Sequence, residues 1–410
     1  MVNKKYSFSI HPKLLPIVVS LLIVFSSITG FYRINDYYYF IALAISGLGI
    51  YLFRKFGSVD RDILLLIIVC IISLLINNPP FYFRAWQRLG AYTLMLFVIS
   101  PLVCSYYSTQ YRKALFNSFW MFCTLLSIGS FISYFLGINF FVRLGEELEI
   151  GVGTFSGLMS HSMILGPIAG MATIFTFIHV VTSRSKIRLL YSVAAILCLG
   201  ACLLSASRAA VGSTLAGCIF SLFIIYRKRL TKLYSIILVV VTIGCATFPI
   251  WGGITDLVIQ KQERNESMGS AFFSRERKFA ARLSEFKSSP IIGIGFCTID
   301  PEYDGVDRSN GQIEPGSSWL AVASMTGTIG FIFFLLIYVK SFLRVTKLKD
   351  VYWKGVLCGM LVFFFFHMIV EGYIFAPRSV LSLLFWLIVA IIEGDFNNQL
   401  LKQSVNKRFV

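Results

Sequence analysis

Two arginines hold positions at which an apolar chain rarely keeps a charge, and Arg208 is the first of them. It lies in LLSASRAAVGS, a connection so short that it places Arg208 at the membrane boundary or slightly within it. A guanidinium at that depth is costly unless a carboxylate, a phosphate or a water-filled cavity receives it. The position therefore predicts a functional arginine.

Helical periodicity selects the second arginine, Arg275. Ser274 can cap a helix over about 274–288 that ends before Pro290. At 100° per residue, Arg275 shares the stripe that holds three large apolar residues of this helix. These residues are Phe279, Leu283 and Phe286. The stripe predicts that Arg275 points toward the membrane body, whereas Arg277 faces away and is solvated.

Two facing guanidinium groups suit a pyrophosphate. Each can grip a phosphate through two parallel charge-assisted hydrogen bonds, with Arg208 below and Arg275 above. Such arginines could stabilise the charge on a leaving diphosphate, which is work often given to a metal. The predicted outer face carries no Asp-x-Asp pair for a metal and no glycine loop for a phosphate. We therefore expect a polyprenyl-linked sugar as the ligand, and neither a metal nor a cofactor.

The composition places these residues in a membrane protein. Hydrophobic residues make up 57% of the chain and charged residues 14%, in apolar runs that can cross about 30 Å of hydrocarbon. The runs are continuous, whereas a transmembrane barrel shows alternation along short strands. The net charge of +17 lies in short loops, which argues against a nucleic-acid partner, and the nine cysteines lack disulfide or metal-ligand spacing. We predict an all-α polytopic membrane protein.

About twelve spans are predicted, and the basic residues orient them. The spans cover about 14–31, 37–53, 62–78, 90–107, 116–137, 161–182, 188–204, 209–226, 233–250, 318–339, 355–375 and 379–393. The connections of one side, with both tails, hold 23 of the 37 lysines and arginines, so both termini are predicted in the cytoplasm. The predicted regions are spans one to nine in 1–251, a large extracytoplasmic loop in 252–317, spans ten to twelve in 318–393 and a cytoplasmic tail in 394–410.

Further unusual residues collect on the predicted outer side. Arg84 and Arg88 lie among aromatic residues in NNPPFYFRAWQRLG and are candidate substrate-binding residues, with interfacial anchoring as an equal alternative for Arg84. Arg378 follows Pro377 and is expected to be a turn residue that faces water. Glu371 lies just inside a span, where it should face a cavity or pair with an arginine.

Three motifs resemble the O-antigen ligase and O-antigen polymerase superfamily of bacterial inner-membrane glycosyltransferases of the GT-C type. SASRAAVGS resembles the family's Ser-Arg-Gly/Ala element. SRERKFAARLSEFKSSPIIGIGF resembles the family's second motif, which is an arginine, a helix and then Pro-hydrophobic-Gly-x-Gly. GSSWLAVASMTGTIG resembles its third motif, a His-Asn-Ser-aromatic-Leu segment followed by Thr-Gly-x-x-Gly. The resemblance implies that Arg208 and Arg275 bind the pyrophosphate of an undecaprenyl-linked glycan. Ser317 and Trp319, in the third motif, are candidate substrate-binding residues.

The third motif also departs from the family, since Gly316 stands where the ligases have a histidine proposed to activate the acceptor hydroxyl. Polymerising members are less strict here, so we predict a repeat-unit polymerase that is inverting and independent of metal and nucleotide sugar. A ligase that transfers the glycan to lipid A-core is the alternative. The implied partners are the undecaprenyl-pyrophosphate-linked oligosaccharide, a glycan acceptor, membrane lipids and other polysaccharide assembly proteins.

A sugar hydroxyl is a poor nucleophile at neutral pH, so a general base would help. The candidates are Glu314, just before Gly316, His161 at the outer start of the sixth span, and Glu371. A capping or packing role is an equal interpretation of His161.

Two other interpretations stay open. A twelve-helix transporter built from two repeats would show related halves and often a central cytoplasmic linker. The long loop is instead off-centre and predicted to be external, and the halves show no similarity. An inactive relative that serves as a scaffold in polysaccharide assembly is compatible with Gly316.

Overall fold

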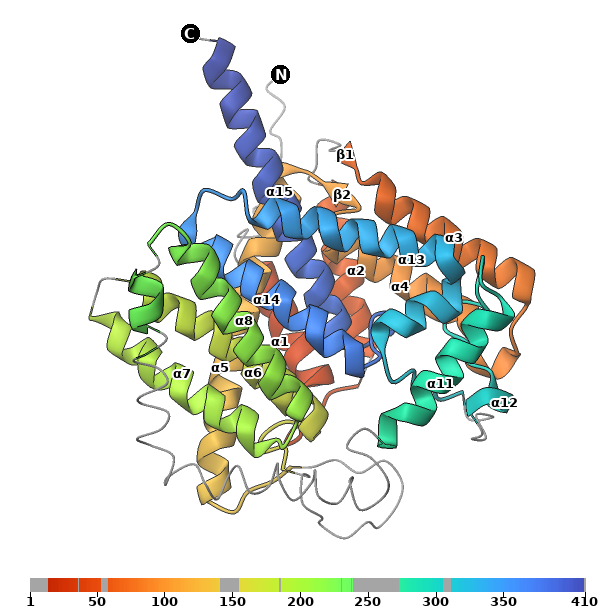
Figure 1. Ribbon diagram of the computed structural model, residues 1–410, viewed down its shortest axis with the longest axis horizontal. Helices are drawn as coiled ribbons and strands as arrows, with labels where there is room; N and C mark the ends of the chain where they lie inside the picture. The colour runs from red at the N-terminus through yellow and green to blue at the C-terminus, as the bar shows by residue number, and fades with distance from the viewer. Residues whose placement is uncertain are drawn as a thin grey trace, which may run out of the picture.

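The computed structural model describes residues 14–35, 37–52, 58–140, 155–183, 186–229, 231–236, 238, 273–304 and 311–408. Most of this is helical. The elements are α1 (Leu14–Ser27), α2 (Tyr37–Leu52), β1 (Ser58–Val59), α3 (Arg61–Asn77), η1 (Phe81–Phe83), α4 (Ala85–Ile99), β2 (Val103–Cys104), α5 (Tyr106–Phe135), α6 (Ser162–Thr182), α7 (Ile187–Leu204), α8 (Arg208–Tyr226), α11 (Phe273–Ser288), α12 (Pro301–Asp304), α13 (Ser318–Val345), α14 (Val351–Val370) and α15 (Val380–Arg408). The helices pack into one body, from which the last turns of α15 project (Figure 1).

Among the described residues, seven helices are long and apolar enough to cross a bilayer, so the predicted class of all-α polytopic membrane protein is confirmed. They are α5, α6, α7, α8, α13, α14 and α15 through Leu401. Two shorter apolar helices, α1 and α2, lie over the first two predicted spans. The number of twelve stays a prediction, and most of the predicted span at 233–250 lies outside the described residues.

The predicted connection at 108–115 is wrong, because α5 already begins at Tyr106. Ser105 caps that helix in a capping box with Ser108. Arg112, which lies between the predicted spans 90–107 and 116–137, is buried. Its Nε donates to the carbonyl oxygen of Val98 at 3.1 Å and its Nη1 to that of Val103 at 3.0 Å. The guanidinium thus satisfies carbonyls at the end of α4 and in β2, which a hydropathy profile cannot register.

Small residues let α6, α8 and α14 pack closely, and their contacts fix the direction of each helix. The Ser221 hydroxyl on α8 donates to the carbonyl of Gly355 at 2.9 Å. A Cβ at Gly217, one turn earlier, would lie 2.7 Å from the carbonyl oxygen of Gly359, one turn later. The helices α8 and α14 are therefore antiparallel.

The helix α6 runs parallel to α8. A Cβ at Gly166 would meet the Ser207 side chain at 2.8 Å, and Gly170, one turn later, packs on Thr214. The N-termini of α6 and α8 consequently lie at the same end of the bundle as the C-terminus of α14.

The helix α13 is broken at Gly327, and a loop from the predicted extracytoplasmic segment fills the break. Gly327 has φ 65° and ψ −169°. Across the break, the amide of Thr328 donates to the carbonyl of Pro290 at 2.8 Å, and the amide of Ile294 donates to the carbonyl of Ser324 at 2.9 Å. These bonds replace the intrahelical bonds that the break removes, as a discontinuous membrane helix requires.

Residues on α3 hold the same junction from the other side. The Ser73 hydroxyl donates to the carbonyl of Met325 at 2.8 Å, and the Asn77 amide donates to the carbonyl of Gly293 at 2.9 Å. The Pro-hydrophobic-Gly-x-Gly motif is therefore a structural plug for α13.

The helix predicted at about 274–288 is α11, Phe273–Ser288, which packs beside α13 (Figure 1). The predicted stripe is only partly right. Arg275 is half-buried and Arg277 is exposed as expected, but Leu283 is 46% exposed. The buried face is rotated toward Arg282 and Glu285, both of which are buried.

The buried face of α11 includes an ion pair between two side chains one turn apart on that helix. Arg282 Nη2 lies 2.7 Å from Glu285 Oε1, which also accepts the amide of Asp300 at 2.7 Å. Burial raises the pKa of Glu285 to about 7, against the opposing effects of the Arg282 guanidinium and that amide. A periodicity count treats both residues as surface groups and so misses them.

Candidate functional site

Two ion pairs fasten α11 to the ends of the membrane helices. Arg275 pairs with Glu371, which ends α14, and Lys278 pairs with Glu314, which precedes α13. The side chains of Arg275 and Glu371 are 19% and 18% exposed, so their pair is largely shielded from water. The expectation that Glu371 pairs with an arginine is confirmed.

The backbone of Glu371 is held as firmly as its side chain. Its carbonyl oxygen accepts the amide of Ser318 at 3.0 Å and the hydroxyl of Ser318 at 2.7 Å. The Ser318 hydroxyl in turn accepts the amide of Tyr373 at 3.0 Å. The start of α13 therefore fixes the chain that leaves α14, and with it the carboxylate that Arg275 meets.

Arg208 is the first residue of α8, half-buried, directly after the capping residue Ser207. The antiparallel register of α8 and α14 places Arg208 level with the last turn of α14, close in register to Met368. Arg208 and Glu371 thus lie at the same end of the bundle. A cation at a helix N-terminus opposes the helix dipole, whereas an anion there would be stabilised by both the dipole and the guanidinium.

His161 has the capping role that the sequence left open. Its Nδ1 accepts the amide of Met163 at 3.0 Å at the start of α6. Because α6 and α8 are parallel, His161 lies at the same end of the bundle as Arg208. Its predicted role as a base stays a prediction, and Nδ1 is already used by the cap.

Ser317 and Trp319 hold α13 against α14. The buried Ser317 hydroxyl donates to the carbonyl of Met368 at 3.2 Å and also accepts the amide of Leu320. The Trp319 indole donates to the carbonyl of Phe365 at 3.1 Å. These bonds give both residues a structural role, and their predicted contact with substrate stays untested.

Gly316, where the resemblance led us to expect a histidine, occupies a position that favours glycine. Its φ is 79°, in the left-handed region that other residues rarely adopt. A Cβ at Gly316 would lie 2.8 Å from the Cβ of Lys278. The stem of Lys278 therefore occupies the space into which a larger side chain would point, while its ammonium group pairs with Glu314.

Gly316→Ala should lower the thermal midpoint of the purified protein more than Gly137→Ala does. Both glycines have positive φ, 79° and 67°, and share a cost of about 1–2 kcal/mol for a Cβ in that region. Only Gly316 adds a clash with Lys278, since a Cβ at Gly137 meets nothing within 4 Å. Equal losses in a thermal-unfolding series in detergent would contradict the crowding at Gly316.

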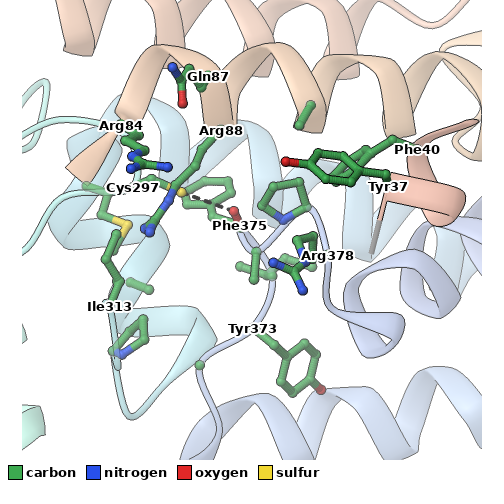
Figure 2. A pocket seen from close by; sticks show the side chains of 18 residues that line it. Tyr37, Phe40, Arg84, Gln87, Arg88, Cys297, Ile313, Tyr373, Phe375 and Arg378 are labelled. Atoms are coloured by element: carbon green, nitrogen blue, oxygen red, sulfur yellow. Dashed lines mark hydrogen bonds between the residues drawn. The ribbon is translucent and has the colours of Figure 1, made fainter. Parts of the chain in front are cut away.

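Beside these pairs lies a cavity of about 650 Å³ lined by three arginines (Figure 2). Arg84 lines it from the junction of η1 and α4, Arg88 from α4, and Arg378 from the turn between α14 and α15. Figure 2 shows Arg84 and Arg88 on one side of the cavity and Arg378 on the other. Arg378, expected to be a turn residue facing water, is exposed and also lines the cavity.

The polar groups around the cavity are fixed by hydrogen bonds. Arg88 Nη2 donates to the carbonyl of Gly311 at 2.7 Å, and the hydroxyl of Tyr39 donates to the carbonyl of Pro377 at 3.0 Å, next to Arg378. Burial raises the pKa of the Cys297 thiol to about 12, and this thiol donates to a carbonyl at 3.1 Å. Burial, reinforced by Glu371, likewise raises the pKa of Tyr373 well above its usual value, so its phenol is neutral. The arginines are thus the charged groups among the residues that line the cavity.

Sequence reasoning missed Arg378 as a cavity residue and Lys278 as the neighbour of Gly316. The signal for Arg378 was its place in EGYIFAPRS, within one short outer turn of Glu371. No comparable signal marked Lys278, because the contact joins α11 to a segment about forty residues further along the chain. Within the described part of the chain, no group of three His, Cys, Asp or Glu side chains is arranged to hold a metal ion.

The fold defines the class, an integral membrane protein built from apolar helices, with a polar helix paired to their ends. Residues 193–335 match the family model described as Wzy_C, O-antigen ligase. This match confirms the resemblance to the O-antigen ligase and polymerase superfamily and supports a role in membrane glycan transfer by an integral bacterial membrane protein. The matched region includes Arg208, Arg275 and Glu314, whereas Arg84, His161 and Glu371 lie outside it. No curated protein matches the chain.

Proposed function

We propose that the chain transfers a glycan from an undecaprenyl diphosphate carrier to a sugar hydroxyl on the extracytoplasmic face of the bacterial inner membrane. The observation that carries this proposal is the shielded Arg275–Glu371 pair, at the end of the bundle where Arg208 begins α8. The two arginines are suited to the donor diphosphate. The carboxylate is suited to the proton of the acceptor.

In the proposed reaction, the diphosphate binds Arg208 and Arg275 and displaces the carboxylate of Glu371 from Arg275. A diphosphate carries more negative charge than a carboxylate and offers more acceptor oxygens, so it competes well for a guanidinium. Donor binding would thereby free Glu371 as a base. The Arg275–Glu371 pair then keeps the base inactive until a donor is present.

The chemical step follows from this exchange. The acceptor hydroxyl attacks the anomeric carbon and gives its proton to Glu371, while the bond from that carbon to the diphosphate oxygen breaks. The diphosphate leaves with the electron pair, and attack from the opposite face inverts the anomeric carbon. Arg208 and Arg275 stabilise the charge that develops on the leaving group, so the proposed step includes no metal ion.

Glu371 is preferred over the other two candidate bases on its surroundings. Glu314 is 55% exposed and pairs with Lys278, and the Nδ1 of His161 caps α6. Glu371 is better shielded and pairs with the arginine that the proposed donor would engage.

The acceptor is proposed to be a second lipid-linked repeat unit, which makes the chain a polymerase. Gly316 supports this choice, because a histidine at that position would meet both a left-handed backbone and Lys278. Transfer to lipid A-core, as in a ligase, is the second candidate and is favoured by the description of the matched family.

A deletion strain distinguishes the two acceptors on a glycan gel. Loss of polymer with a single repeat unit on the final acceptor is the expected result for a polymerase. Full-length polymer that accumulates on the lipid carrier would instead assign a ligase. An unchanged glycan profile would contradict the proposed function in either form.

A further inference from the structure

The cavity beside Glu371 has the charge of a second anion site. Three of its eighteen lining residues are arginines and none is an Asp or Glu, within the described part of the chain. The walls are otherwise mostly apolar or aromatic, among them Phe40, Ile313 and Phe375. Guanidinium groups among apolar walls are suited to the phosphate-bearing head of an amphipathic ligand, because arginine binds phosphate in a bidentate manner.

The backbone at the mouth of the cavity is also unusual. Arg84 has φ 49°, in the left-handed region, at the junction of η1 and α4. Such a conformation is costly for a residue with a Cβ and tends to occur where the side chain must be aimed. Arg84 and Arg88, about one helical turn apart, both line the cavity (Figure 2).

The cavity adjoins the proposed catalytic carboxylate without containing the proposed donor arginines. Gly372 and Tyr373, the two residues after Glu371, line it, as does Pro315, the residue after Glu314. Arg208 and Arg275 are not among its lining residues. Glu371 therefore pairs with Arg275 and directly precedes two residues that line the cavity.

We propose that this cavity binds the diphosphate of the acceptor, so that the chain holds two prenyl diphosphates, one on each side of Glu371. The inference rests on the proposed function and names its second substrate. Arg84 and Arg378 bind the acceptor diphosphate, and Arg88, already bonded to Gly311, completes the wall. The phosphate of an anionic membrane lipid has the same oxyanion chemistry and could occupy the same cavity. The experiment below distinguishes this ligand from the acceptor diphosphate.

The test is a binding titration of the full chain in phosphatidylcholine nanodiscs, with farnesyl diphosphate as the probe. The wild type should bind two equivalents. The double variant Arg84→Gln/Arg378→Gln should bind one, with affinity at the other site lowered at least about tenfold. Arg275→Gln should also bind one equivalent, because it removes the proposed donor site. Arg277→Gln, on the exposed face of α11, is the control and should still bind two equivalents.

Each other outcome decides between the two proposals. If the wild type binds one equivalent and only Arg275→Gln loses it, the acceptor site is overturned and the proposed function stays intact. If the wild type binds one equivalent and only the double variant loses it, the cavity site is supported and the assignment of the donor to Arg275 is contradicted. No binding by the wild type overturns the inference. Loss of the second equivalent when phosphatidylglycerol is added assigns the cavity to a lipid headgroup and overturns the acceptor assignment.

A folding defect is separated by a conservative variant. Arg84 and Arg378 are both exposed, so their replacement should leave the thermal midpoint unchanged. Arg84→Lys/Arg378→Lys keeps the charge and should restore part of the second-site affinity. Unchanged stoichiometry in both double variants would overturn the inference.

Discussion

Arg275→Lys should lower the rate of glycan transfer by about 10²-fold or more while the protein stays folded in the membrane. A lysine keeps the charge but cannot form two parallel hydrogen bonds to a diphosphate, and loss of one charge-stabilising donor costs about 10²–10³ in rate. Long glycan chains in cells should disappear accordingly. The measurement is the chain-length ladder of a complemented deletion strain, with membrane abundance determined in parallel.

The control for this variant lies on the same helix. Arg277→Lys makes the same chemical change at an exposed position two residues away and should leave the ladder normal. A normal ladder from Arg275→Lys would contradict its assignment to the diphosphate, because Arg275 is proposed to bind the leaving group directly.

Arg208→Lys should have a similarly large effect, since it removes the other half of the proposed diphosphate site. Arg208 begins α8 and Arg227 caps its other end, so Arg227→Lys is the matched control. The ladder from Arg227→Lys should be normal. Equal defects in both variants would point to packing of α8 and not to a bound diphosphate.

Gly293→Ala and Gly327→Ala should have the largest effects on folding. Gly293 has φ 77° and Gly327 has φ 65°, and a Cβ at either would overlap backbone atoms of the opposing segment. Backbone cannot move aside as a flexible side chain can, so the loop would be expelled from the break in α13. The strained φ alone costs about 1–2 kcal/mol. The total should exceed this and lower both membrane abundance and the thermal midpoint in detergent.

Gly212→Ala is the control for these two variants. It lies inside α8, where a Cβ meets nothing within 4 Å. Because alanine favours helix over glycine by about 1 kcal/mol, this substitution should be neutral or stabilising. Wild-type stability of Gly293→Ala would contradict the packing of the plug against α13.

Much of the fold could be predicted from the sequence, because membrane helices are recognised by their length and hydropathy. The polar helix α11 was predicted to within about a residue, since Pro290 follows its end. The predicted cap is wrong, because the helix begins at Phe273 and Ser274 lies in its first turn. Its buried face was less predictable. Arg282 and Glu285 form an ion pair inside the structure, and a hydrophobic stripe cannot anticipate a buried ion pair.

The site was predicted in its parts and not in its arrangement. Arg275 and Glu371 were both chosen from the sequence, but their pairing joins positions 96 residues apart. The cavity of Arg84, Arg88 and Arg378 combines α4 with the turn after α14, and no local pattern links those segments. The glycines of the third motif were recognised by resemblance alone. The structure supplies their physical reason, which is close backbone approach at Gly327.

The most direct test is transfer by the purified chain in nanodiscs, supplied with a polyprenyl diphosphate-linked oligosaccharide as the substrate. Released polyprenyl diphosphate and lengthened glycan are measured together by mass spectrometry. The proposed reaction predicts one diphosphate released for each glycosidic bond formed, at a rate that falls about 10²-fold or more in Arg275→Lys and is unchanged in Arg277→Lys. Wild-type rates in Arg275→Lys, or release of diphosphate without a new glycosidic bond, would contradict it.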